Sequence, residues 1–142
     1  MLSDIYNEKI TILTRWRRSD SKKELDTWYK YTINDCAWYT DSARSAGGNA
    51  VYIGTYITAL IPFHDDFVPY IDWKKLSDED KQNLFTISNG DYLILGGVSE
   101  DINASNVVAT VEQYQPNVCL VRHVQQVHDR FGATVQLKVQ GV

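Results

Sequence analysis

Apolar and polar residues alternate along several short runs of the chain, with the period of two that is typical of β-strands. In residues 9–16, Ile10, Ile12 and Trp16 fall on one face, while Lys9 and Leu13 fall on the other. The same period predicts further strands at residues 27–33, 37–40, 50–61, 118–127 and 134–139. The last two of these runs are close enough in sequence to form a hairpin.

Residues 85–97 predict two strands that are joined by a tight turn. Asn89-Gly90 suits a two-residue hairpin loop, and Gly96-Gly97 ends the second run. Residues 92–95 are apolar on both faces, which favours a strand that is buried on both sides. We expect Asp91, beside the turn, to accept hydrogen bonds from nearby backbone amides; the alternative is a catalytic carboxylate.

Helical signals are short and few. Residues 72–76 predict one helical turn, and Ser77 followed by acidic residues resembles a capping box that starts a helix towards Leu84. Residues 107–114 fit helical spacing and stop before Pro116, although their valines also suit a strand. Residues 41–49 are small, polar and glycine-rich without any period, so they predict an exposed, mobile loop.

These elements together predict a single domain over residues 1–142. The fold class that they indicate is mainly β, as an antiparallel β-barrel or closed sandwich of about seven strands with one or two short helices. Four Trp and nine Tyr are many for 142 residues, which also favours strands. No internal repeat or low-complexity segment is present.

The formal net charge of −4 is unevenly spread. Residues 1–30 hold seven Lys or Arg against five Asp or Glu, whereas residues 31–142 hold seven against thirteen. This balance argues against a general nucleic-acid binder, which would need to neutralise phosphates. The local basic cluster is interpreted as a solvated strand end and turn; its members are Arg15, Arg17, Arg18, Lys22 and Lys23.

Targeting and membrane signals are also missing from the sequence. The first six residues do not resemble a signal peptide, and the apolar run at residues 50–63 is too short to span a bilayer. Cys36 and Cys119 stand apart, so we expect reduced, buried thiols rather than a disulfide framework. We therefore expect no association with a membrane.

Two groups of residues superficially resemble metal or acid–base sites. His64-Asp65-Asp66 is interpreted as loop polarity, because adjacent residues on an extended chain point apart. Cys119, His123 and His128 do not share one face of a strand unless a bulge intervenes. The glycines of residues 41–49 lack the spacing of a phosphate-binding loop. The sequence therefore predicts no catalytic residue, no bound metal and no cofactor.

The spaced aromatics and the glycine-aspartate strand opening resemble those of a known group of proteins. The residues concerned are Cys36, Trp38, Ile61-Pro62, Trp73, Leu76 and the segments 27–33, 85–87 and 90–96, with the closing hairpin. They resemble small tailed-phage and prophage morphogenesis proteins, of the minor capsid or head-to-tail connector kind. The resemblance spans most of residues 9–140, but residues 100–116 do not line up.

This resemblance implies a small β-barrel that docks on neighbouring chains and completes the head or links it to the tail. It implies no enzyme activity and no cofactor. The expected partners are other phage structural proteins, such as portal, adaptor or tail components, with a possible homo-oligomeric ring. The expected location is the virion, or the host cytoplasm during assembly.

The segment 41–49 is our candidate for contact with a partner. Its glycine pair, Gly47 and Gly48, lowers the cost of bending, and Arg44 offers a guanidinium to a carboxylate or a carbonyl. An idle surface loop is the alternative.

Two other functions remain as alternatives. The first is an oligonucleotide-binding barrel in which aromatic side chains stack on bases; the candidates are Trp28, Tyr29, Tyr31, Trp38 and Tyr39. The second is a small hydrolase that uses His64, His123 or His128 beside a carboxylate or hydroxyl.

Overall fold

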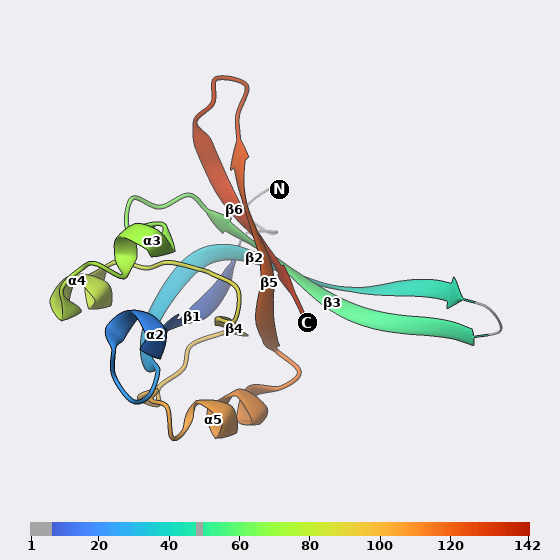
Figure 1. Ribbon diagram of the computed structural model, residues 1–142. Coiled ribbons are helices and arrows are strands. Elements are labelled where there is room, and N and C mark those ends of the chain that lie inside the picture. The colour runs from blue at the N-terminus through green and yellow to red at the C-terminus, as the bar shows by residue number, and fades with distance from the viewer. Residues whose placement is uncertain (1–6, 48–49) are drawn as a thin grey trace.

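The computed structural model describes residues 7–47 and 50–142, and for 41–47 and 50–55 it describes the backbone alone. Six antiparallel strands close into a barrel in the order β1-β2-β3-β6-β5-β4 (Figure 1). The strands are β1 (Glu8–Trp16), β2 (Thr27–Gly47), β3 (Ala50–Pro62), β4 (Tyr92–Leu95), β5 (Val118–His128) and β6 (Thr134–Gly141). The predicted mainly β, closed fold is confirmed, with six strands where about seven were expected.

The alternation of the sequence sorts side chains between the barrel interior and its outer wall. On β1, Ile10 and Ile12 lie in the interior, whereas Leu13 lies in a second cluster outside the barrel. The interior is apolar; its buried members are Ile10, Ile12, Ile33, Cys36, Ile57, Ala59, Ile61, Phe85, Ile87, Leu93, Cys119, Val121, Leu137 and Val139. Both cysteines are free and buried, as expected.

The strands predicted at residues 27–33 and 37–40 are parts of one strand, β2. The predicted gap coincides with an irregularity, because Glu8 of β1 pairs with Cys36 and Ile10 pairs with Ile33. Asp35, inside that irregularity, has a φ of 62°. The chain therefore keeps its direction through a bulge where the sequence pattern indicates a break.

Four short helices lie outside the barrel in the described part of the chain, more than the one or two predicted. They are α2 (Arg18–Ser21), α3 (Tyr70–Trp73), α4 (Asp78–Asn83) and α5 (Val107–Tyr114). The predicted cap of α4 is confirmed, since the Ser77 hydroxyl accepts a hydrogen bond from the Asp80 amide at 3.2 Å. The helix at 107–114 is also confirmed; Val107 and Val111 of α5 pack with Leu13 and Ile94 on the outer wall.

The hairpin predicted at residues 85–95 is wrong in its first half. Only residues 92–95 form a strand, β4, which pairs with β1 and β5. Phe85 makes an isolated bridge to Phe67 and belongs to no strand. Its side chain is buried in the core. The alternating apolar residues of 85–87, Phe85 and Ile87, are thus buried in the interior although they do not belong to a strand.

The turn at Asn89-Gly90 is also different from the one predicted. Gly90 has a φ of 93°, but Asn89 does not have a positive φ, as expected for a type II turn rather than the hairpin type I′. The prediction for β4 itself is confirmed, because Leu93 is buried inside the barrel and Ile94 outside it.

The prediction of an exposed loop at residues 41–49 is wrong for 41–47, which continue β2. Each of these residues pairs with β3, from Asp41 opposite Tyr56 to Gly47 opposite Ala50. The remaining residues of the predicted loop, 48 and 49, lie outside the described residues. Small residues do not favour a strand, but backbone hydrogen bonds to the β-prone residues 51–57 do not depend on side chains.

Candidate docking surfaces

A two-stranded arm projects from the barrel (Figure 1). We call residues 41–47 and 50–56 the arm. In the described chain, β6 pairs with β3 only from Ile57 to Pro62, and β1 pairs with β2 only up to Cys36. The arm strands therefore pair with each other alone. Seven residues of strand extend by about 23 Å.

Such an arm has little of its own to hold it together. A hairpin of two strands is marginally stable in water, and its outer edges carry unpaired N–H and C=O groups that can accept another strand. Two of the residues proposed for partner contact lie in it: Arg44 pairs with Ile53, and Gly47 forms the last pair with Ala50. Gly48 lies outside the described residues.

The outer barrel wall next to the arm is nearly free of charge. A shallow groove of about 530 Å³ runs across β2, β3, β6 and β5. It is lined by uncharged and aromatic side chains with a single lysine; they are Tyr39, Tyr56, Thr58, Leu60, Gln125, Val127, Gln136, Lys138 and Gln140. Tyrosine-rich, charge-poor surface is typical of the centre of protein interfaces.

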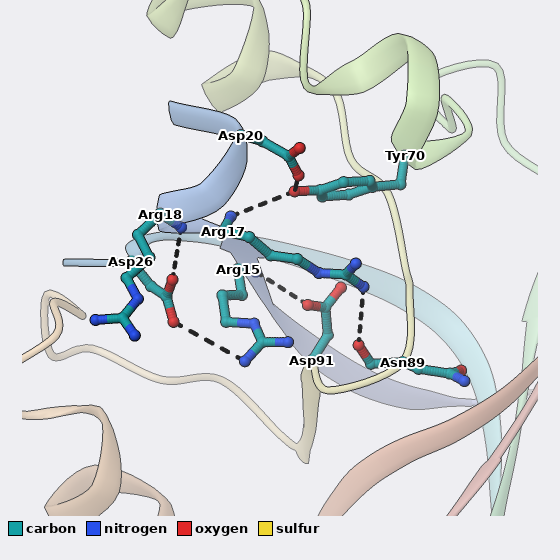
Figure 2. A network of polar contacts seen from close by, with 8 residues as sticks. All are labelled: Arg15, Arg17, Arg18, Asp20, Asp26, Tyr70, Asn89 and Asp91. Atoms are coloured by element: carbon teal, nitrogen blue, oxygen red, sulfur yellow. Dashed lines mark hydrogen bonds and ion pairs between the residues drawn. The ribbon is translucent and has the colours of Figure 1, made fainter. Parts of the chain in front are cut away.

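Asp91 is fully buried beside the turn that precedes β4. One carboxylate oxygen accepts a hydrogen bond from the Arg15 amide at 3.0 Å (Figure 2). The other accepts from the Ser88 amide at 2.9 Å and from the Ser88 hydroxyl at 3.3 Å. The expected contacts to backbone amides are confirmed, and they fasten the turn to β1.

Burial raises the pKa of Asp91 to about 7, although the hydrogen bonds from Arg15 and Ser88 and the charge of Arg15 oppose this shift. The side chain has no path to a substrate, because none of its surface is exposed.

Three arginines from the end of β1 and the start of α2 line an open groove of about 520 Å³, which we call the arginine groove. Its lining is Arg15, Arg17, Arg18, Ser19, Leu25, Asp26, Trp28, Ala104 and Val107. Asp26 is the one acidic member, and its carboxylate lies between two of the arginines (Figure 2). It accepts a hydrogen bond from the Arg18 amide at 2.7 Å and lies 3.9 Å from the Arg15 guanidinium.

Tyr70 of α3 anchors α2 next to this groove. Its hydroxyl donates to Asp20 at 2.7 Å and accepts from the Arg17 amide at 3.3 Å (Figure 2). Burial and the Asp20 carboxylate raise the pKa of Tyr70 to about 12. The hydrogen bond from Tyr70 and the charge of Lys74, 3.5 Å away, hold the pKa of Asp20 below its usual value despite some desolvation.

Lys81 of α4 is buried, which no sequence pattern predicts. Its ammonium lies 4.1 Å from the Trp16 ring centre and 5.5 Å from that of Trp73, and it donates to the Leu76 carbonyl. Aromatic faces attract the cation and replace part of its hydration. Burial lowers the pKa of Lys81. The contacts join α4 to the barrel wall.

Of the two metal-like motifs, the one made of Cys119, His123 and His128 does not come together. Cys119 is buried in the core, where burial raises its pKa to about 11, whereas His123 and His128 are exposed on β5. His64 lies 3.6 Å from Asp66, and both side chains are largely exposed. Within residues 7–47 and 50–142, no group of three or more His, Cys, Asp or Glu is placed to hold a metal ion.

The histidines proposed for a hydrolase occupy open surface. His128 lies 3.2 Å from the Thr134 hydroxyl across the terminal hairpin, in an exposed position. His64 pairs with Asp66, which also accepts a hydrogen bond from Tyr31 at 2.6 Å. Burial and that bond raise the pKa of Tyr31 to about 12. Neither histidine lines any of the grooves described above.

The aromatic residues proposed to stack on bases are mostly engaged within the protein. Trp28 stacks on Tyr92 at 5.7 Å, and Trp38 packs against the core. Tyr29 packs edge-on against Trp73 and donates to Asp78, and burial raises its pKa. Of the five candidates, Tyr39 alone is classed as exposed, at 41%. The described surface therefore offers no row of aromatic faces for a single strand.

The chain belongs to a family of unknown function, DUF6751, whose model matches residues 5–142. A comparison with curated proteins found no match. A comparison with solved structures found no match either. In the described part of the chain, no helix has the length and apolar character needed to cross a bilayer.

Proposed function

We propose that the protein is a structural subunit of tailed-phage or prophage particles, in head completion or as a head-to-tail connector (minor capsid) subunit. It acts by docking to other structural chains, such as portal, adaptor or tail proteins, and uses no enzyme activity and no cofactor. It resides in the virion, or in the host cytoplasm during assembly, and binds neither membranes nor specific nucleic-acid sequences.

The arm is the observation that carries this proposal. A closed barrel supports a ribbon that pairs with nothing else in the described chain and leaves two strand edges open. Natural proteins usually blunt or cover such edges, because these edges add strands from other chains. The open backbone groups of the arm can form hydrogen bonds to a strand of a neighbouring chain, by strand addition.

The charge-poor groove across β2, β3, β6 and β5 supports the same proposal. Tyr39 and Tyr56 lie where the arm leaves the barrel, so the charge-poor wall and the open edges form one continuous surface. When a subunit uses one patch to contact a different patch on its neighbour, a ring results if the rotation between neighbours closes, and an open filament results if it does not. A ring of copies is the arrangement that we propose for the particle.

The test is assembly by an arm-excised variant in a lysogen or phage whose own copy of the gene is deleted. Residues 42–55 are replaced by Asn-Gly, which can close the turn because Asp41 and Tyr56 are direct partners. Particles are purified by density gradient, and the chain is quantified in them by mass spectrometry. We expect the wild-type chain at a fixed copy number and the arm-excised chain to be absent, with fewer completed particles.

Phe131→Ser is the matched control, because Phe131 is 80% exposed on the other projecting hairpin. It is expected to enter particles normally. Absence of the wild-type chain from purified particles would refute the proposed function. Normal incorporation of the arm-excised chain would place the docking surface on the barrel wall instead.

A further inference from the structure

We infer that the arginine groove is a second docking site, which receives a peptide segment with a carboxylate next to a large apolar side chain. The site is independent of the arm. That the peptide belongs to another particle protein rests on the proposed function.

The first argument is an excess of positive charge. Arg15, Arg17 and Arg18 line the groove against Asp26, in a protein whose formal net charge is −4. Both oxygens of Asp26 are already directed to the two arginine residues that flank it. Asp91 and Asp20, which lie outside the lining, offset part of the charge of Arg15 and Arg17. Among the described residues, the guanidinium left without a carboxylate is therefore that of Arg18, and there the groove is complementary to a further negative charge.

The second argument is that hydrogen-bond donors are left over. The Arg15 Nε is buried and has no partner among the described atoms. The Arg18 guanidinium is exposed and makes no contact in the polar network, although its backbone amide is bonded (Figure 2). A buried donor without a partner costs free energy, so the Arg15 guanidinium is incompletely satisfied within the protein. The exposed Arg18 guanidinium is the one that an incoming carboxylate can reach. Guanidinium groups bind carboxylates through paired hydrogen bonds.

Arg17 differs from Arg18 because it is held in place. Its guanidinium lies 5.0 Å from the Tyr70 ring centre and donates to the Asn89 carbonyl at 3.4 Å. It therefore supplies fixed charge to the groove wall, as Arg15 does beside Asp26, whereas Arg18 supplies free donors.

The third argument is an apolar floor next to the charge. Trp28 is held by stacking on Tyr92, and Leu25 is 63% exposed. Both residues also line an adjoining hollow of about 430 Å³ whose further members include Ile102 and Ala104. A side chain such as Leu or Phe would remove this apolar surface from water. The two hollows share Leu25, Asp26, Trp28 and Ala104, so one short peptide can occupy both.

A peptide fits these observations better than a nucleic acid does. Affinity for a nucleic acid grows with the number of phosphates that are neutralised. Glu24 and Asp26 interrupt the positive charge along the adjoining hollow, so a run of phosphates would meet repulsion there. A single carboxylate can instead stay at the Arg18 guanidinium while its apolar neighbour enters the adjoining hollow.

The experiment is a titration followed by two-dimensional ¹H–¹⁵N NMR. The probe is the peptide acetyl-Gly-Asp-Leu-Phe-Glu-Gly-amide, and its matched control carries Asn and Gln in place of Asp and Glu. We expect the acidic peptide to shift the Trp28 indole signal and the amides of residues 15–19 and 102–107. The amide peptide should bind about tenfold more weakly, because charge-assisted hydrogen bonds are lost.

Two charge reversals localise the binding. Arg18→Glu should weaken the acidic peptide about tenfold, since the guanidinium is replaced by a like charge. Arg130→Glu makes the same change in net charge on the exposed turn between β5 and β6 and should leave affinity within about twofold. Arg18→Lys keeps the charge but removes the planar fork, and should give an intermediate loss.

The inference fails if millimolar peptide leaves the groove signals unmoved, or if Arg130→Glu weakens binding as much as Arg18→Glu does. It also fails if oligo(dT) shifts the same signals at a lower concentration than the peptide. The arm-excised variant should bind the peptide like the wild type. Loss of peptide binding and loss of assembly therefore report separately on this inference and on the proposed function.

Discussion

The arm is built from the far ends of two of the six barrel strands, β2 and β3, yet the barrel and the arm are stabilised in opposite ways. Between residues 57 and 60, β3 is paired on both sides, and Ile57 and Ala59 are buried in the core. Between residues 50 and 56 the same strand has one neighbour and runs outside the barrel (Figure 1). The strand is thus stabilised by the fold where it pairs with two neighbours and packs on the core. Where it has one neighbour, its free edge can hydrogen-bond to another chain.

The largest effect should come from the barrel interior. Leu93→Ala removes a fully buried side chain from the core and leaves a cavity, so it should lower the free energy of unfolding by about 3–5 kcal/mol. Leu25→Ala, the same change at a mostly exposed position, should cost less than about 0.5 kcal/mol. Urea denaturation followed by far-UV circular dichroism measures both. Equal losses would show that the barrel core is not where stability resides.

The Asp91 carboxyl should make the barrel less stable as the pH rises from about 4 to about 7. Its folded-state pKa is raised to about 7, against about 3.9 in an unfolded chain, so the folded state binds more protons between these values. The free energy of unfolding should fall across this window by about 2–4 kcal/mol and stay level above it.

Denaturation of the wild type and Asp91→Asn at several pH values tests this. The variant cannot ionise at this position, so its stability should lack that part of the slope. Asp20 and Glu100 have lowered pKa values and therefore act in the opposite sense: their contribution to the free energy of unfolding is lost as the pH falls below this window. A wild-type stability that rises between pH 4 and 7 would contradict the assignment.

A smaller loss is expected at the turn that holds Asp91. Gly90→Ala puts a side chain at a φ of 93°, and its Cβ would approach the Arg15 Nη2 to 2.7 Å. The strain should cost about 1–3 kcal/mol. Gly97→Ala is the matched control, since Gly97 has no positive φ and its Cβ would meet only Lys9 at 3.7 Å. If the two variants melt together, the turn does not need its positive φ.

The smallest effect should come from the arm. The arm-excised variant is expected to unfold within about 0.5 kcal/mol of the wild type, because the excised strands pair with each other alone. Amide hydrogen exchange should show the same contrast in the intact protein, with fast exchange in the arm and slow exchange in residues 57–61. A variant that unfolds during purification would mean that the arm is part of the folding unit.

The sequence predicts the barrel strands well where one residue in two must face the barrel interior. Residues 9–16 and 134–139 alternate cleanly, and Ser77 marks the start of α4 by a local hydrogen bond. The prediction fails where structure depends on a distant partner. Residues 41–47 carry no strand pattern in the sequence, and their strand is formed by backbone pairing with β3.

The arginine groove shows the same limit. Its basic cluster is visible in the sequence, and it was interpreted as a solvated strand end. The apolar floor is assembled from residues 25–28 and 104–107, which the barrel closure brings together. Lys81 also gives no signal, because its burial depends on tryptophans at positions 16 and 73.

The position of β6 has a consequence for synthesis of the chain. β6 lies between β3 and β5, and Gly141 pairs with both Ile57 and Val121. A Cβ at Gly141 would overlap the Leu120 carbonyl oxygen, so the end of β6 packs closely against β5. The wall cannot close before residues 134–141 have left the ribosome, and its contacts of high sequence separation make folding slow. The arm joins neighbours in sequence, so it can pair during translation, while the barrel that carries it is still open.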